Sequence, residues 1–190
     1  NRARQENAEG IETTFAVNYL AQFQLTLRLL GRLFDSRPAR IVNVASDAHK
    51  VVKLRLDDLQ LRQGYSWWAA YCHSKLAVVY FTRELARRLR CTGVTANAVD
   101  PGPVASRIAS NNPGLLAGAD SLAIRSLFPS PQRAARTAVW LASSPELEGI
   151  SGCYFKWHRL RAPRVGPDEQ AIASTLWNES TRLTDIDYRG

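Results

Sequence analysis

Residues 69–85 read AAYCHSKLAVVYFTREL, and the rest of the chain is interpreted outward from this stretch. Tyr71 and Lys75 are four positions apart, so in a helix they share one face and the ammonium group lies beside the phenol. Val78 and Phe81 continue that face at helical spacing, which predicts a helix whose reactive side borders the core. Because a nearby cation favours phenolate, we expect Lys75 to lower the pKa of Tyr71 toward a range useful for proton transfer.

Two apolar runs flank this predicted helix. Residues 41–46 read IVNVAS, a short strand that ends in Ser46, and residues 94–102 read VTANAVDPG, a second strand that Pro101-Gly102 breaks. Ser46 is then placed to hold a substrate oxygen whose proton Tyr71 transfers. Taken alone, a Tyr-x-x-x-Lys spacing also fits a core tyrosine beside a solvated lysine.

The order strand, Tyr/Lys helix, strand and Pro-Gly resembles that of the short-chain dehydrogenases/reductases. Within the family, the chain is most similar to the branch containing the retinol dehydrogenases and the X-linked dehydrogenase/reductase that acts on polyprenols. The resemblance implies a Rossmann-type, doubly wound parallel α/β sheet and one domain over residues 1–190. It runs from about Gly10 to about Leu183, through FAVNYLAQFQLT, RIVNVAS, LDDLQ, AAYCHSKLAVVYFTREL, GVTANAVDPGPV, PELEGISGCYF and a late LW.

The resemblance also implies four catalytic residues. Tyr71 exchanges the proton, Ser46 hydrogen-bonds the same substrate oxygen, and Lys75 binds the nicotinamide ribose. Asn18, in FAVNYL, matches the family's asparagine that holds a water in a proton relay. The alternative for Asn18 is a helix polar residue that makes a local backbone bond.

The implied cofactor is NAD or NADP, and the implied reaction moves hydride between it and a lipophilic alcohol, aldehyde or ketone. Residues 101–106 match the family's Pro-Gly-x-Val-x-Thr turn, with serine at the last position. An ordinary strand-ending turn is the alternative. The expected cofactor contacts are Tyr71, Lys75, Pro101, Gly102, Val104 and Ser106.

Residues 111–128 correspond to the family's substrate lid. Their apolar side chains suit a retinoid, polyprenoid or steroid better than a sugar, although a helix that buries one face on the core is an equal alternative. These side chains are Leu115, Leu116, Leu122, Ile124, Leu127 and Phe128.

Two family features do not occur in this sequence: the Gly-rich Thr-Gly-x-x-x-Gly-x-Gly turn that holds the cofactor pyrophosphate, and the Asn-Asn-Ala-Gly that ends the fourth strand. The sequence is therefore expected to be an N-terminally truncated form. Such a chain should bind NAD(P)H weakly and leave the strand at 41–44 as an unpaired edge. The competing hypothesis is a non-enzymatic interaction module. In the family, the residue that selects NAD or NADP lies in the same N-terminal part, which this sequence does not contain, so the choice between them cannot be predicted.

Composition excludes several classes of function. With 190 residues and 45% hydrophobic content the chain can bury one core. Its net charge of +8 could suit an anionic partner, but arginines that complement the dipole in the last turns of the Tyr71 helix and face solvent explain it more simply. No basic stripe is interleaved with stacking aromatics, so no nucleic-acid binding is expected.

Residues 156–164, KWHRLRAPR, combine a tryptophan with basic residues and could meet a membrane surface, although a solvated loop is the simpler alternative. An endoplasmic reticulum or other membrane-associated location is suggested by the resemblance alone.

The remaining reactive side chains suggest no further site. Three cysteines without metal-ligand spacing predict neither a disulfide scaffold nor a zinc site, and no metal is expected. We interpret them as buried or inert thiols and the three histidines as structural or exposed. These residues are Cys72, Cys91, Cys153, His49, His73 and His158.

The other predicted elements are helices over 9–30, 131–143 and 167–183 and a strand over 150–155. The helix over 9–30 is apolar nearly all round, which requires burial on more than one side. By resemblance, this helix and the Tyr71 helix are expected to form a homodimer surface, with Leu20 and Phe23 as outward positions.

Overall fold

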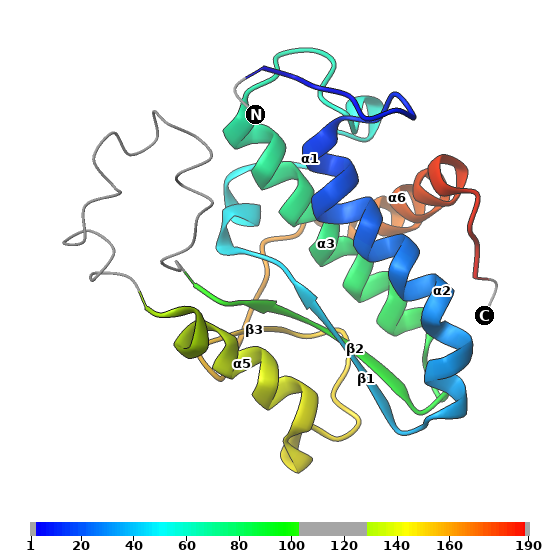
Figure 1. Cartoon of the computed structure of the whole chain (residues 1–190), viewed down its shortest axis with the longest axis vertical. Coiled ribbons are helices and arrows are strands. Elements are labelled where there is room, and N and C mark those ends of the chain that lie inside the picture. Colours follow the sequence, from blue (N-terminus) through cyan, green and yellow to red (C-terminus); the bar gives the residue numbers. More distant parts are fainter. Residues whose placement is uncertain (1–2, 103–128, 189–190) are drawn as a thin grey trace.

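The computed structural model describes residues 3–102 and 129–188 as an α/β fold. Its four-stranded sheet has the order β1 (Ala39–Val44), β2 (Val94–Asp100), β3 (Tyr154–Lys156) and β4 (Arg159–Arg161). The first three strands are parallel and β4 is antiparallel to β3. In Figure 1 the helices α2, α3 and α6 lie on one side of the sheet and α5 lies on the other. The predicted α/β class with a mostly parallel sheet is confirmed.

The central helix is α3 (Trp67–Arg88), which carries Tyr71 and Lys75. Ser66 caps its N-terminus by accepting a hydrogen bond from the Ala69 amide. From Ala70 to Ala86 nearly every side chain is buried or half-buried. The helix therefore lies between the sheet and two other helices.

The first helical region begins later and ends later than predicted. It consists of α1 (Thr13–Phe15), a π-helical turn η1 (Ala16–Leu20) and α2 (Ala21–Asp35). Glu12 begins it, because its carboxylate accepts from the amides of Thr14 and Phe15. The extension past residue 30 lets Leu33 and Phe34 pack against the main core.

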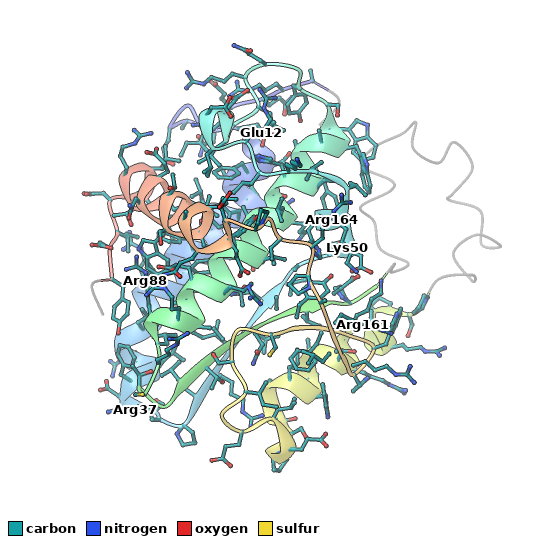
Figure 2. All side chains as sticks on the ribbon, turned by 180° about the vertical axis from the view of Figure 1, so that it is seen from behind. Glu12, Arg37, Lys50, Arg88, Arg161 and Arg164 are labelled. Atoms are coloured by element: carbon teal, nitrogen blue, oxygen red, sulfur yellow. The ribbon has the colours of Figure 1, made fainter. Side chains whose placement is uncertain are left out.

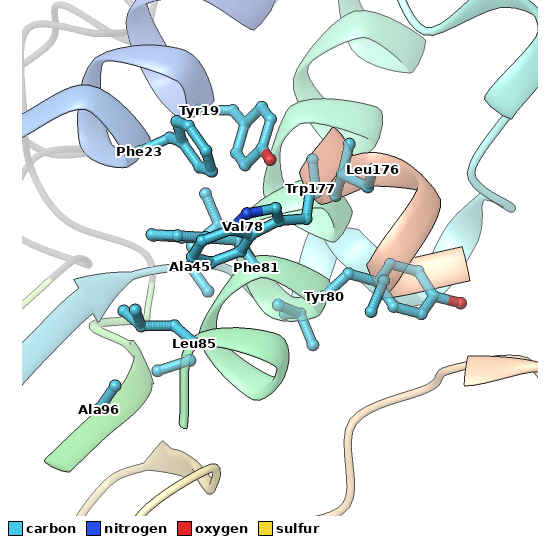
Figure 3. Close-up of a cluster of buried hydrophobic side chains, with 14 of the residues drawn as sticks. Tyr19, Phe23, Ala45, Val78, Tyr80, Phe81, Leu85, Ala96, Leu176 and Trp177 are labelled. Carbon is cyan, nitrogen blue, oxygen red and sulfur yellow. The ribbon is translucent and has the colours of Figure 1, made fainter. Parts of the chain in front are cut away.

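The helix α6 (Glu169–Thr184) covers two residues that were predicted to point outward. Leu20 and Phe23 were expected to point outward, but their side chains are 3% and 0% exposed. The indole of Trp177 covers this region, with ring centroids 5.2 Å from Phe23 and 5.9 Å from Phe81 (Figure 3). An element that is distant in the sequence therefore fills the space that a second subunit was expected to take.

The exposed apolar stripe of this helical region lies elsewhere. Val17, Leu25 and Leu29 are 64%, 61% and 44% exposed. Their spacings of eight and four place them on one side of the helix, opposite the residues that contact α3 and α6. This stripe replaces the predicted Leu20 and Phe23 as the outward apolar positions.

The end of the sheet also differs from the prediction. The expected strand over 150–155 is shorter, and residues 156–164 do not form a simple loop, because β4 turns back onto β3. The turn residues Trp157 and His158 both have positive φ, at 54° and 57°, as tight hairpin turns require. Neither is glycine or asparagine, so the usual turn signal is missing from the sequence. Tertiary contacts hold the turn, because the His158 ring packs 5.2 Å from that of Trp140.

The helix α5 (Pro131–Ser143) has the predicted bounds and closes the second face of the sheet. It packs over a small cluster of Val99, Leu141, Leu147 and Phe155. Short 3₁₀ turns complete the described part of the chain: η2 (Asp47–Val51), η3 (Leu56–Asp58) and η4 (Pro145–Leu147).

Among the cysteines, which were predicted to be buried or inert, Cys91 is exposed. Cys72 is buried and Cys153 is half-buried, and burial raises the pKa of both thiols.

Candidate active site

The site begins at the carboxyl ends of β1 and β2. Register pairs Val44 with Val99, and the Ala45 amide donates to the Val99 carbonyl at 2.8 Å. The residues that follow these strands, Ser46 and Pro101, therefore lie at the same edge of the sheet. In open α/β sheets this edge is where ligands bind.

Ser46 is held by the turn that it begins. Its hydroxyl accepts from the Ala48 amide at 3.2 Å as the N-cap of η2. The buried ring of His49 lies 2.7 Å through Nδ1 from the Ser46 carbonyl, and its Nε2 accepts from the Arg164 amide at 3.1 Å. These two bonds define a neutral ring with the proton on Nδ1, in agreement with a pKa that burial lowers. His49 is thus structural, as predicted, and fixes the backbone of Ser46.

Tyr71 meets Ser46 across this edge. The half-buried phenol interacts with the Ser46 hydroxyl, and the ring stacks on Trp68 with centroids 5.7 Å apart. Burial raises the pKa of Tyr71 above its usual value, and the bond to Ser46 opposes that effect only in part. At neutral pH the phenol therefore carries its proton.

Lys75 lies in the site but does not act on Tyr71 as expected. Its ammonium donates to the Val44 carbonyl at 3.0 Å and lies 5.8 Å from the centre of the Tyr71 ring. Burial lowers the pKa of Lys75. The pKa of Tyr71 is raised and not lowered, because burial disfavours the phenolate and the Asp100 carboxylate adds to that effect.

Asn18 reaches the same helix from behind. It lies in the π-helical turn η1, a distortion that often marks functional positions. Its Nδ2 donates to the Ser74 hydroxyl at 3.1 Å, and that hydroxyl donates to the Tyr71 carbonyl at 2.7 Å. The Asn18 side chain therefore contacts α3 through Ser74 instead of making the local backbone bond considered as its alternative. The structure brings Ser46, Tyr71 and Lys75 together and places Asn18 one side chain away.

A carboxylate network that sequence reasoning missed lies beside these residues. Asp100, at the end of β2, is 3% exposed and accepts from the Lys156 ammonium at 2.9 Å. Lys156 also donates to Asp47 at 2.7 Å. Their positions in the sequence could have indicated this network. Asp47, Asp100 and Lys156 all fall at or just after the carboxyl ends of neighbouring parallel strands.

The Pro-Gly turn is shaped by close packing. Gly102 has φ of 77°, and a Cβ there would lie 2.5 Å from Cζ2 of Trp157, so no larger residue fits without rearrangement. Its amide donates to Asp100 Oδ1 at 2.7 Å. Val104, Ser106 and the expected lid at 111–128 lie outside the described residues. Within residues 3–102 and 129–188, no group of three or more potential metal-ligating side chains occurs and no helix is long and apolar enough to span a membrane.

The sequence of the chain is similar to those of known proteins. A model of the short chain dehydrogenase family matches residues 1–114. The chain is 42% identical over 184 residues to retinol dehydrogenase 13 of Mus musculus, covering 94% of this chain and 55% of that protein. It is 37% identical over 199 residues to human polyprenol dehydrogenase, covering 96% of this chain and 57% of that protein. The chain thus spans about half the length of these relatives.

Solved structures agree with the architecture. An uncharacterised protein from Mycobacterium paratuberculosis is 27% identical and superposes with a TM-score of 0.72, over 99% of this chain and 64% of that chain. A 3-oxoacyl-(acyl-carrier protein) reductase with bound NAD from Brucella melitensis is 25% identical, with a TM-score of 0.52 over 74% of this chain and 47% of that chain.

Proposed function

This chain belongs to the short-chain dehydrogenase/reductase family, and from that premise we propose that it supplies the catalytic residues of an NAD(P)-dependent oxidoreductase. The enzyme interconverts a lipophilic alcohol and its aldehyde or ketone. One observation carries the proposal: the hydroxyls of Ser46 and Tyr71 meet at the carboxyl end of the sheet, with the Lys75 ammonium beside them.

The chain's own groups suit proton transfer to a carbonyl oxygen. In the reducing direction, the protonated phenol of Tyr71 donates its proton while Ser46 hydrogen-bonds the same oxygen. In the oxidising direction Tyr71 must first lose its proton, and the Lys75 ammonium favours that state once a bound substrate and cofactor exclude water. In this proposal Asn18, which contacts α3 through Ser74, holds a water that relays protons to the site.

The residues fit the nicotinamide end of NAD(P), which supplies or accepts the hydride when bound. Lys75 lies beside the Tyr71 ring at the end of β1, and in this proposal its ammonium holds the ribose. The chain's sequence contains no Gly-rich turn for the pyrophosphate. We therefore expect calorimetric titration of the 190-residue chain with NADH or NADPH to detect no micromolar binding.

The substrate class comes from the relatives. Two that match over most of this chain are named retinol dehydrogenase and polyprenol dehydrogenase, and both names denote long apolar alcohols. A retinoid or polyprenoid alcohol or aldehyde is accordingly the proposed substrate.

Turnover in a lengthened protein tests the proposal. The part of mouse retinol dehydrogenase 13 that precedes the matched region is joined to Asn1, and NAD(P)-dependent turnover of retinal and a long prenol is measured. Tyr71→Phe should lose about 10²- to 10⁴-fold in kcat. Cys72→Ser is the matched control and should be nearly silent. A chimera that binds cofactor without turnover, or near-full kcat in Tyr71→Phe, contradicts the proposal.

A second function, an interaction module, is favoured by two surfaces. In the described residues β1 pairs with β2 alone, and the stripe of Val17, Leu25 and Leu29 on the first helical region is exposed. Homodimerisation through that stripe is the form we propose. Leu25→Asp should shift the sedimentation of a dimer toward monomer, whereas a wild-type chain that is monomeric at all concentrations contradicts this assignment.

Membrane-surface association is proposed through the β3–β4 hairpin. Trp157 and Leu160 are 40% and 64% exposed, and no acidic residue occurs between Glu148 and Asp168. Within the described residues Arg159 and Arg161 form no ion pair. Figure 2 shows Arg161 near α5, with Lys50 and Arg164 along the same side.

Exposed arginine beside exposed apolar side chains is the pattern that binds anionic lipid surfaces. Arg161→Glu should weaken cosedimentation with anionic vesicles, while Arg28→Glu on α2 should weaken it less. Equal loss in the two variants would show that only net charge matters.

A further inference from the structure

A single buried carboxylate ties together the two segments that frame the proposed site. Asp100 Oδ1 accepts from the Gly102 amide at 2.7 Å, and Oδ2 accepts from the Asp47 amide at 3.1 Å. The first bond shapes the Pro-Gly turn, and the second holds the residue that directly follows Ser46. One side chain therefore fixes the spacing between the loop after β1 and the turn after β2.

Lys156 holds this carboxylate from the next strand. Its backbone is the register partner of Asp100, and its ammonium lies 2.9 Å from Asp100 Oδ2 and 2.7 Å from Asp47 Oδ2. Asp47 also accepts from the Tyr154 hydroxyl at 3.0 Å and from Lys50 at 2.7 Å. The carboxyl ends of three strands are thus joined through one network of charged hydrogen bonds.

Fold stability alone does not account for this arrangement. A buried ion pair often stabilises a fold no better than apolar residues of similar size, so its presence suggests a role in geometry. The two carboxylate oxygens of Asp100 also accept from the amides of Asp47 and Gly102, which lie in loops and not in strands. The loops they hold are those that carry Ser46 and the Pro-Gly turn.

We propose that Asp100 and Lys156 are positioning residues, which hold Ser46 against the Tyr71 hydroxyl and keep the Gly102 turn in place beneath the site. This inference rests on the proposed function, because it assigns the pair to the same reaction. Neither residue touches the substrate oxygen. Their effect reaches it through the backbone amides of Asp47 and Gly102 and through their charges.

Charge gives the pair a second, separable effect. The Asp100 carboxylate disfavours phenolate at Tyr71 and favours the ammonium form of Lys75, and Lys156 offsets that field. Removing the two charges should therefore move the Tyr71 ionisation in opposite directions, whereas a purely structural loss would move both variants in the same direction. The charged or titratable groups around Asp100 are Asp47, His49, Lys50, Tyr71, Lys75, Tyr154 and Lys156.

The experiment uses the cofactor-free 190-residue chain, so its failure is separate from any failure of turnover. Tyrosine labelled at Cζ is titrated by NMR, with the Tyr71 signal assigned from Tyr71→Phe. Asp100→Asn should lower the pKa of Tyr71 and Lys156→Met should raise it. Amide exchange at Gly102 and Asp47 should become at least about tenfold faster in Asp100→Asn.

The controls separate positioning from general destabilisation. Arg83→Met and Glu169→Gln break another ion pair, between α3 and α6, and should leave the Tyr71 titration unchanged. Lys156→Arg retains the charge and should restore wild-type behaviour. Lys156→Met carries the test by itself if Asp100→Asn does not fold. An unchanged Tyr71 pKa in Lys156→Met, or shifts of the same sign in both network variants, would overturn the proposal.

Discussion

The two halves of α3 are both buried, but different forces hold them. In the N-terminal half, polar side chains reach other segments: Tyr71 interacts with Ser46, His73 accepts from the Arg55 amide, and Lys75 donates to the Val44 carbonyl. In the C-terminal half, Phe81 and Leu85 pack among α2, α6 and the sheet. Directional bonds position reactive groups, and apolar contacts supply most of the stability. One helix can therefore carry function and stability on separate residues.

The largest expected effect on stability is in the apolar half. Phe81 is 2% exposed and contacts Phe23, Tyr19 and Trp177. Phe81→Ala should lower the free energy of unfolding by about 3–5 kcal/mol in urea titration, because it removes apolar burial and leaves a cavity. Leu25→Ala, at an exposed position of α2, is the control and should cost about 0.5 kcal/mol or less. Similar costs at the two positions would break the comparison.

The next effect depends on pH and tests the polar half. Burial lowers the pKa of His73 to about 4, with a further contribution from Arg55. In the unfolded chain this histidine binds a proton near pH 6.5. The stabilisation that depends on a neutral His73 is therefore fully present above that pH and is lost as the pH falls toward 4. The loss is about 3 kcal/mol.

Urea titrations from pH 7 to pH 4 measure this loss. The difference between wild type and His73→Gln isolates it, since the other titrating groups are shared. If the two proteins lose stability in parallel, the buried neutral His73 does not cause the loss.

A smaller effect is expected at Glu84, the buried acid of the apolar half. Burial alone would raise the pKa of Glu84, but bonds from Arg87 and Arg88 outweigh it and lower the pKa. Because both arginines are partly exposed, Glu84→Gln should cost only about 1–2 kcal/mol at pH 7. The difference should shrink as the pH falls below the ordinary carboxyl pKa and through the lowered pKa of Glu84, where the folded wild type takes up the proton and loses the pair. A difference that is independent of pH would rule out the ion pair as its source.

The smallest expected effect on stability is at the proposed catalytic residue. Tyr71→Phe keeps the half-buried ring and its contact with Trp68, and it removes one hydroxyl at the edge of the site. The free energy of unfolding of the 190-residue chain should change by about 0.5 kcal/mol or less. A cost above about 1.5 kcal/mol would show that this hydroxyl is structural.

Much of the fold was predictable because local patterns agree with it. The start of α5 followed from Pro131, and the short apolar runs that begin at Ile41 and Val94 predicted the strands β1 and β2 to within two residues at each end. The hairpin after β3 was not predictable, because the positive φ of Trp157 and His158 is held by contacts with distant residues. The same holds for Leu20 and Phe23, whose orientation depends on the indole of Trp177.

For the site, the sequence by itself determined the family, the α/β class and the candidates Ser46, Tyr71 and Lys75, because their spacing is set by one helix and one strand end. The catalytic roles of these residues and of Asn18 stay predictions. Tertiary structure alone decided the ionisation of Tyr71, the contact of Asn18 with Ser74, and the network of Asp100 with Asp47 and Lys156. Burial and charge pairing arise between strands and helices that are far apart in the chain, so no local pattern encodes them.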